Sequence, residues 1–276
     1  MQFASRESLV TARERFASLT SDASTEALRT LSDELFAVAG VIARERTLRR
    51  YLADPASSEQ KRRRLADTLF GGKIADSTLD TVQGLVASRW SRGADLVDAV
   101  ETLAREAALA IAEQDGVIED VEDELFRFAR TLSAEPRLRD LLADEGQPVD
   151  GRLGLIDGLV DGKVQPVTQQ LLHQVVRLPR GRGLDALVER LADLAAQRRG
   201  RSVARVTAAA PLTAEQERRL AEDLSRIYGR SMDVQVELDA DLLGGLVIRV
   251  GDEVIDGSVA SRLAAARRQL AGQSQT

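Results

Sequence analysis

The chain has 276 residues, with 38 basic and 44 acidic side chains, one histidine and no cysteine. The missing cysteines exclude disulfides, thiolate zinc sites and thiol nucleophiles, and the single histidine excludes metal sites that need two imidazoles. An aromatic content of 3% and a net charge of −6 argue against nucleic-acid binding, which needs basic surface and stacking side chains. The composition favours a scaffold over an enzyme, so we expect no catalytic residue, no metal and no cofactor.

The N-terminus and the apolar segments carry no membrane signal. Residues 1–7 run directly into charged side chains and lack the apolar core of a signal peptide. The longest apolar stretches, 107–112 and 242–248, fall far short of the roughly 20 residues that cross a bilayer. We therefore expect a protein that is cytosolic or attached to a membrane only through something else.

The first 200 residues contain an internal repeat with an offset of 90. The tetrapeptide Asp-Glu-Leu-Phe at 33–36 recurs at 123–126, and Gly72-Lys73 recurs at 162–163. About a third of the positions between 33 and 95 match their counterparts without a gap, which is more than shared helical composition produces. We interpret the repeat as a tandem duplication. It predicts a helical bundle at 1–115, a second bundle at 116–200 and a further domain at 201–276.

The first copy is predicted to be helical. Apolar residues recur every three or four positions between 28 and 42, the spacing of an amphipathic helix. Asp54-Pro55 interrupts the following segment because proline lacks an amide donor. Ser57 and Gln60 have the spacing of a capping box that starts the next helix, and Gly71-Gly72 ends it. Two more helices are predicted at about 79–86 and 94–111.

The second copy repeats this pattern and ends in a helix from 184 to about 197. One alternative stays open at the boundary between the copies. The helix near 101–113 either closes the first bundle alone or also serves as the first helix of the second, because the linker between the copies is short.

The pattern changes after residue 200, where a β-α-β-β-β-α order is predicted. Alternating apolar and polar residues at 234–238 are typical of a strand with one solvated face. Thr213 and Gln216 have the spacing of a second capping box. The predicted elements lie at 203–209, 213–229, 234–238, 246–248, 253–255 and 258–270. The predicted fold class is thus mainly α, with two tandem helical bundles followed by a small α+β C-terminal domain.

Four other patterns are interpreted as structural. Gly71-Gly72-Lys73 lacks the hydroxyl residue of a phosphate-binding loop because Ile74 follows it, and the acidic run at 119–124 lacks the spacing of a calcium loop. His173 is interpreted as a solvated or hydrogen-bonded helix residue. The arginines at 177, 180 and 182 are interpreted as a solvated face, with an acidic partner as the alternative.

Residues 242–259, Leu-Leu-Gly-Gly-Leu-Val-Ile-Arg-Val-Gly-Asp-Glu-Val-Ile-Asp-Gly-Ser-Val, closely resemble the C-terminal signature of the delta-chain family of F-type ATP synthase. The mitochondrial member of that family is the oligomycin-sensitivity-conferring protein. The helical part is similar to the family's six-helix N-terminal bundle, here in an elongated form with a duplicated module. Within the signature, we expect the glycines to serve backbone geometry. The signature residues are Gly244, Gly245, Gly251, Asp252, Asp256, Gly257 and Ser258.

This resemblance implies a non-catalytic stator subunit in the peripheral stalk of the ATP synthase. The N-terminal bundle would bind N-terminal segments of the alpha chains in the F1 head, and the C-terminal domain would join the membrane-anchored b chain. The protein would be peripheral to the cytoplasmic face of a bacterial plasma membrane, as part of the complex. The alternative is a helical adaptor of another complex.

The groove for the alpha segments is assigned to residues on the expected first helix and around the expected helix at 79–86. Trp90 can either belong to this contact surface or fill the edge of the bundle. The predicted partner-binding residues are Leu9, Arg13, Val82, Val86 and Trp90.

Overall fold

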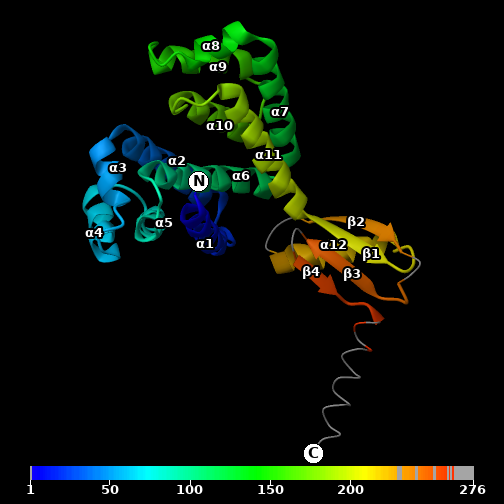
Figure 1. Cartoon of the computed structure of the whole chain (residues 1–276). Coiled ribbons are helices and arrows are strands. Elements are labelled where there is room, and N and C mark those ends of the chain that lie inside the picture. Colours follow the sequence, from blue (N-terminus) through cyan, green and yellow to red (C-terminus); the bar gives the residue numbers. More distant parts are fainter. Residues whose placement is uncertain are drawn as a thin grey trace, which may run out of the picture. The chain divides into compact units, whose positions relative to one another are not determined.

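The computed structural model describes residues 2–228, 232–239, 242–250, 253–259, 261 and 263. The chain divides into two compact units, Met1–Ala192 and Asp193–Thr276 (Figure 1). The boundary between the units falls inside helix α11. The helices up to this boundary are α1 (Phe3–Thr20), α2 (Thr25–Arg44), α3 (Arg46–Leu52), α4 (Glu59–Phe70), α5 (Asp76–Ala87), α6 (Gly93–Gln114), α7 (Ile118–Ala134), α8 (Pro136–Ala143), α9 (Val149–Val160), α10 (Pro166–Arg177) and α11 (Leu184–Ser202).

The repeat in the sequence is also a repeat in the structure. Shifted by 90 positions, α1 to α6 correspond in order to α6 to α11, so that α1 begins at Phe3 and α6 at Gly93. Helix α6 therefore ends the first copy and also stands where the second copy needs its first helix. The two copies share this helix, which answers the alternative left open by the sequence. The division into three domains at 115 and 200 stays a prediction.

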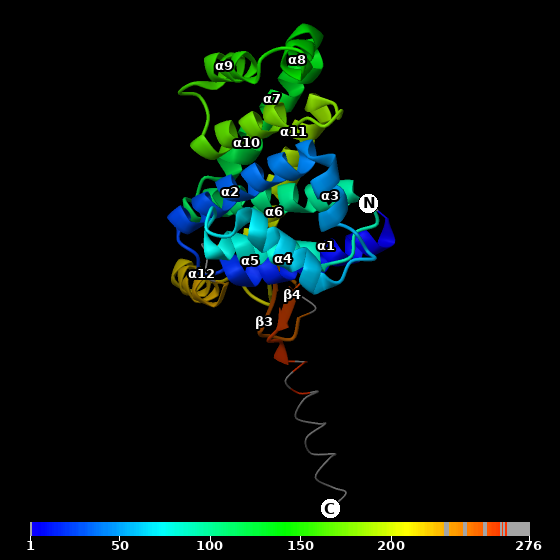
Figure 2. The same ribbon diagram turned by 90° about the vertical axis from the view of Figure 1, so that its left-hand side faces the viewer.

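Much of helix α6 is buried because it packs against helices of both copies. Its apolar run Ala107–Ala112 has side chains that are at most 5% exposed. A helix segment that is apolar on all its faces is typical of a buried position, and α6 packs against α2 of the first copy and against α7 and α10 of the second (Figure 2).

The two copies hold their fifth helices in the same way. On α2, the Glu34 carboxylate accepts hydrogen bonds from the Ala75 amide (3.1 and 3.0 Å) and the Thr78 hydroxyl (2.5 Å) at the start of α5. On α7, Glu124 accepts the matching bonds from Gln165 (3.1 and 3.0 Å) and from Thr168 (2.5 Å) at the start of α10. A carboxylate is favoured there because it pairs with free amides at the positive end of the helix. This contact explains why the Asp-Glu-Leu-Phe motif recurs.

A buried arginine is duplicated as well. Arg62 donates from Nε to the Val86 carbonyl (2.6 Å) and from Nη2 to the Ala87 carbonyl (2.8 Å), at the end of α5. Its counterpart Arg152 donates from Nη1 to the Val176 carbonyl at 3.0 Å, at the end of α10. Each guanidinium thus pairs with carbonyls that have no partner within their own helix.

The second unit contains a four-stranded sheet. Its elements are β1 (Val203–Ala208), α12 (Ala214–Tyr228), β2 (Asp233–Leu238), β3 (Leu246–Val250) and β4 (Glu253–Asp256). The strand order is β2-β1-β3-β4, with β1 parallel to β2 and antiparallel to β3. Its small core gathers around Ala204, Leu224, Met232 and Val250. The prediction of a mainly α chain with a small α+β C-terminal domain is confirmed.

Of the two predicted capping boxes, one forms. The Gln216 amide donates to the Thr213 hydroxyl at 3.2 Å, and the Thr213 amide donates to the Gln216 side chain at 2.8 Å. The box at Ser57 is wrong, because α4 begins after Ser58 and the Ser57 carbonyl accepts a bond from the Arg62 guanidinium instead. The predicted final helix to residue 270 lies mostly outside the described residues. Among the described helices, none is long and apolar enough to cross a membrane.

Candidate functional site

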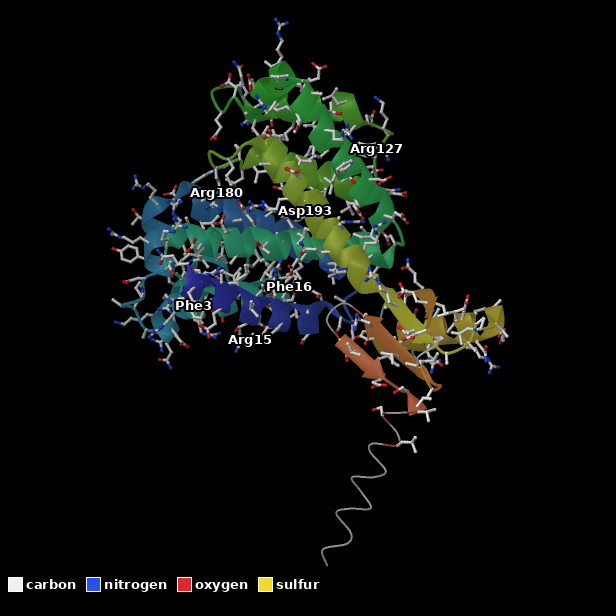
Figure 3. All side chains as sticks on the ribbon, turned by 45° about the vertical axis from the view of Figure 1, so that its right-hand side comes forward. Phe3, Arg15, Phe16, Arg127, Arg180 and Asp193 are labelled. Carbon is white, nitrogen blue, oxygen red and sulfur yellow. The ribbon has the colours of Figure 1, made fainter. Side chains whose placement is uncertain are left out.

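A groove runs between α1 and α5 in the first copy. Its volume is about 230 Å³, and its floor is apolar, made by Phe16, Leu85 and Leu103. Arg15 and Phe16 are neighbours on α1, the first exposed and the second buried (Figure 3). Small or uncharged residues line the sides of the groove, and charged residues lie beside them. The side and charged residues are Thr11, Ala12, Thr81, Gly84, Ser88, Arg15, Arg63 and Asp80.

Gly84 leaves the α5 side of the groove open. A Cβ added at Gly84 would meet no atom within 4 Å. Glycine in a helix interior costs about 1 kcal/mol relative to alanine, and no described atom near Gly84 excludes a side chain. An absent side chain allows another backbone to approach closely, which suits a groove that takes a partner helix.

Polar contacts fix α1 against the rest of the first copy. The fully buried Ser5 hydroxyl donates to the Asp95 carboxylate (2.8 Å) and accepts a bond from the Ser91 amide (2.8 Å). One turn later, the Ser8 hydroxyl donates to the Arg89 carbonyl at 2.7 Å. These bonds join α1 to the connection between α5 and α6, so the chain itself positions the walls of the groove.

The groove has the properties of a helix-docking surface. An apolar floor between small side chains accepts the apolar face of an amphipathic helix, and flanking charges orient it. The lining residues include no histidine or cysteine. In the part of the chain that the structure describes, no group of three or more His, Asp or Glu side chains could hold a metal ion.

The C-terminal signature forms a tight crossing of two backbone segments. Gly244 and Gly245 have φ angles of +138° and +83°, in the region that favours glycine. A Cβ on Gly245 would lie 2.5 Å from the Gly257 carbonyl oxygen. The crossing is closed by backbone bonds from Gly257 to Leu246 (2.9 Å) and from Val259 to Gly244 (2.9 Å).

Two polar signature residues close the turn after β4. The Asp256 carboxylate accepts a bond from the Ser258 amide at 2.9 Å, and the Ser258 hydroxyl accepts one from the Ser261 amide at 3.2 Å. Hydrogen bonds from the Ser258 side chain and backbone lower the pKa of Asp256. These contacts are local, which agrees with a structural role for the motif. Gly251 and Asp252 lie outside the described residues.

The C-terminal signature lies in a region that matches a known family of proteins. The sequence model for the ATP synthase delta (OSCP) subunit matches residues 103–270. The chain belongs to this family. The match begins inside α6, so it includes the second copy and the C-terminal unit.

Relatives in the delta family share the full length of this chain. The chain is 46% identical to the ATP synthase subunit delta of Streptomyces griseus over 272 residues, covering 99% of this chain and all of the relative. It is 47% identical to the subunit delta of Streptomyces avermitilis, covering 97% of this chain and 98% of that one. Both relatives therefore match this chain through both copies of the repeat and the C-terminal unit.

Other relatives carry additional sequence. The chain is 47% identical to the ATP synthase subunit b-delta of Mycobacterium sp. strain KMS, over 98% of this chain and 61% of the relative. Among solved structures, a chain of the mitochondrial ATP synthase hexamer of Toxoplasma gondii matches at 25% identity, covering 60% of this chain and 94% of that one. The TM-score of that match is 0.29, so no structural argument rests on it.

The five predicted partner-binding residues of this delta-family chain lie on or next to α1 and α5, but outside the lining of the groove. Leu9 is half-buried on α1, and Arg13 pairs with Glu106 of α6 at 2.6 Å. Val82 and Val86 are 0% exposed, and Trp90 is 4% exposed with Nε1 donating to the Leu85 carbonyl at 2.7 Å. As folded here, these three side chains belong to the core of the bundle. Their role in partner binding stays a prediction.

Sequence reasoning missed the residues that do line the groove. Thr81 and Gly84 on α5 and Ser88 directly after it recur at three- and four-residue spacing, and Thr81 and Gly84 each precede a buried residue, Val82 and Leu85. This small-residue line is the signal that could have found the groove. Apolar character points instead to Val82 and Val86 on the same helix, and those side chains pack inward.

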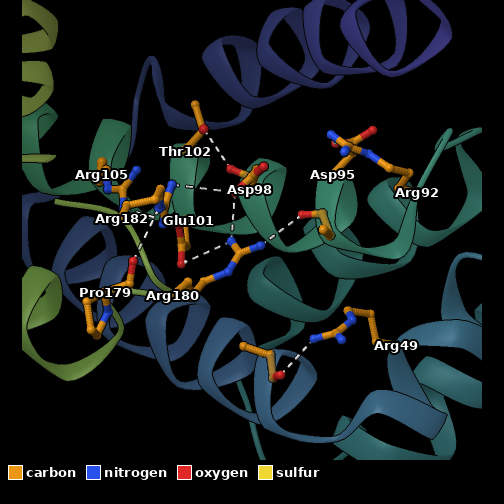
Figure 4. Close-up of polar contacts among 12 residues, drawn as sticks. Arg49, Arg92, Asp95, Asp98, Glu101, Thr102, Arg105, Pro179, Arg180 and Arg182 are labelled. Carbon is orange, nitrogen blue, oxygen red and sulfur yellow. Dashed lines mark hydrogen bonds and ion pairs between the residues drawn. The ribbon is translucent and has the colours of Figure 1, made fainter. Parts of the chain in front are cut away.

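An ion network joins the two copies at α6 (Figure 4). After α10, Arg180 donates to Asp98 at 2.7 Å, and Arg182 pairs with Glu101 at 3.0 Å. Arg105, on α6 itself, pairs with the same Glu101 oxygen at 3.1 Å. Burial lowers the pKa of Arg105, while Glu101 opposes that shift. The interpretation of Arg180 and Arg182 as solvated is therefore wrong, because both guanidinium groups bind carboxylates of α6.

His173 is hydrogen-bonded on the surface of the second copy. Its Nε2 lies 2.6 Å from Oδ1 of Asp157, and the Gln169 side chain donates to the same oxygen at 2.7 Å. Hydrogen bonds from Gln169 and then from His173 lower the pKa of Asp157. The pair links α9 to α10, which agrees with a structural role for the only histidine.

Proposed function

We propose that this chain works in the peripheral stalk of an ATP synthase by joining N-terminal segments of the alpha chains in the F1 head to the b chain. Membership of the delta family, with 46% identity over nearly the whole chain to a subunit delta, is the observation that carries this proposal. The role is mechanical rather than catalytic. The head must stay still while the rotor turns, and a close-packed helical bundle resists the deformation that torque imposes.

The groove between α1 and α5 supports the head contact. A helical alpha segment would place apolar side chains on Phe16, Leu85 and Leu103 and bring its backbone close to Gly84. Acidic residues of the segment would meet Arg15 and Arg63, which outnumber the one carboxylate of the lining. Helix-in-groove binding of this kind needs a preformed groove, and the Ser5 and Ser8 bonds provide one.

The b-delta relative supports the second contact. In Mycobacterium, a protein named b-delta contains a region 47% identical to this chain within a longer sequence. A single chain that carries both names keeps b and delta parts next to each other, and we infer the same neighbourhood here between separate chains. The association with the cytoplasmic face of the bacterial plasma membrane would then come through the complex.

A substitution in the groove tests the head contact. Gly84→Gln adds a long side chain in empty space and should weaken binding of a synthetic peptide from the N-terminus of the alpha chain at least tenfold. The emission of Trp90, the only tryptophan, reports binding because its indole is bonded to the carbonyl of Leu85. Gly158→Gln, at an exposed helical glycine of α9 with equally open space, is the matched control and should bind normally. Equal affinities for the two variants would remove the groove from the proposal.

A helical adaptor of another complex is the competing function. Purification of the tagged chain from membranes should recover the alpha and b chains of the ATP synthase, and the isolated chain should neither bind nor hydrolyse nucleotide. Recovery of a different complex from membranes that lack alpha and b would favour the adaptor. Stoichiometric nucleotide hydrolysis by the isolated chain would contradict a non-catalytic role.

A further inference from the structure

A second, larger cleft lies over α6 where the two copies meet. Its volume is about 590 Å³, and α2, α6 and α10 form its walls. It is separate from the groove between α1 and α5, with which it shares no lining residue.

The second cleft is the counterpart of the first groove in the repeat. Shifting the groove residues Thr11, Arg15, Gly84 and Ser88 by 90 positions gives residues that all line the second cleft. These are Glu101, Arg105, Gln174 and Leu178. The same pair of helices, first and fifth of each copy, thus forms a hollow in both copies. The region matched by the delta-family model begins at residue 103, so of this lining it includes Arg105, Gln174, Arg177 and Leu178 but none of the α2 residues.

Helix α2 gives the second cleft a wall that the first groove lacks. Phe36 is buried at the cleft, while Val41 is 45% exposed although it is a large apolar residue. Gly40 lies on the same face, and a Cβ there would meet no atom within 4 Å. The Gln170 side chain donates to Asp33 at 2.7 Å and so ties α10 to α2 at this face of α2. The exposed Val41 side chain and the open Gly40 therefore both line the cleft.

Charge indicates what fits there. The lining carries three arginines, Arg44, Arg105 and Arg177, against two carboxylates. Glu101 pairs with Arg105 and Asp33 accepts a bond from Gln170, while Arg44 and Arg177 are the exposed cations of the lining. The first groove has the same excess, with two arginines against one aspartate. An occupant with acidic residues beside an apolar face complements both hollows.

We propose that the α2–α6–α10 cleft is a second docking site for an amphipathic helical segment with acidic flanks, the same class of partner as that of the first groove. One chain then binds two such segments, which gives the duplication a function. The proposal rests on the proposed function above, because it takes the partner class from the first groove.

Titration calorimetry on the full chain tests the proposal, with a synthetic peptide from the N-terminus of the alpha chain as the probe. We expect two peptides per chain. Gly40→Gln and Gly84→Gln each place a long side chain in one hollow only, and each should leave one peptide per chain. The double variant should bind none, and Gly158→Gln should still bind two. Both glycines lie in helices with open space beside them, so the variants should fold.

The outcomes separate the two proposals. One peptide per chain that is lost in Gly84→Gln and kept in Gly40→Gln would overturn the second site and leave the proposed function intact. Two peptides that persist in Gly40→Gln would place the second site elsewhere and overturn the cleft assignment. No binding by any variant, including the unaltered chain, would overturn both proposals.

Discussion

At the scale of single residues, the buried Glu101 holds together the ion network between α6 and the segment after α10. Glu101 is 1% exposed and faces Arg105, Arg180 and Arg182 from two segments of the chain. Arg180 also adopts a φ of +54°, which is uncommon for a residue with a side chain. The three ion pairs of Glu101 and the turn at Arg180 support each other, so the network should respond strongly to the loss of this carboxylate.

Glu101→Gln should lower the free energy of unfolding of the helical unit by about 3 kcal/mol, because removing one partner leaves buried arginine charge uncompensated. Denaturant unfolding followed by Trp90 emission measures the loss, since Trp90 lies in this unit. Asp123→Asn is the matched control, because its carboxylate is 72% exposed and 4.0 Å from Arg127. The control should change the same quantity by less than about 0.5 kcal/mol. Similar losses for the two variants would contradict a special role for Glu101.

At the scale of elements, the chain reuses one set of contacts in different places. The first turns of α5 and α10 are both held by a glutamate from the second helix of their copy, and the last turns by a buried arginine. In the C-terminal unit, the backbone crossing at Gly245 holds the segment after β4 against the start of β3 through two backbone hydrogen bonds. At this crossing there is no room for a side chain on Gly245.

Gly245→Ala should destabilise the C-terminal unit by about 1–3 kcal/mol, the usual cost of a strained backbone. The cause is the Cβ that would lie 2.5 Å from the Gly257 oxygen, together with the φ of +83°. Thermal unfolding by circular dichroism should show an earlier transition, while Trp90 emission in the helical unit should keep its midpoint. Gly200→Ala, in α11 with open space around it, should not lower either midpoint. An unchanged dichroism curve for Gly245→Ala would refute this account.

At the scale of the whole molecule, corresponding faces of the two copies differ: the α2 face carries small residues where the α7 face carries arginines. The face that α2 presents to the second cleft includes Phe36, Ala37 and Gly40. Its counterpart on α7 has Phe126, which is 53% exposed, with Arg127 and Arg130 in place of the two small residues. Arg130 lies over the Phe126 ring at 5.9 Å. A terminal repeat needs a polar outer face to stay soluble, and the arginines supply it.

Restoring the residues of the first copy should make the chain self-associate. In Arg127→Ala/Arg130→Gly, the exposed α7 face resembles that of α2 and can seat in an open groove of another copy, a contact that does not close on itself. Sedimentation velocity should show an association constant raised about tenfold, equivalent to about 1.4 kcal/mol. Arg218→Ala/Arg219→Ala on the exposed face of α12 should sediment like the unaltered chain. Identical sedimentation for both double variants would count against the α7 face.

The sequence by itself determined the class of fold, the duplication and the family. Helical spacing, the 90-residue offset and the glycine-rich signature are local patterns, and the chain follows them because capping, turn geometry and amphipathic burial act between near neighbours. The Asp-Glu-Leu-Phe repeat is an example, since both glutamates end up at the same place in their copies.

Only the tertiary structure decided which faces of the helices stay open. It made α6 common to both copies, turned Val82, Val86 and Trp90 inward, and brought Arg180 and Arg182 onto Asp98 and Glu101. The reason is physical: whether a side chain is buried or exposed depends on what packs against it from distant parts of the chain. The periodicity of a helix identifies its apolar face but not the element that covers that face.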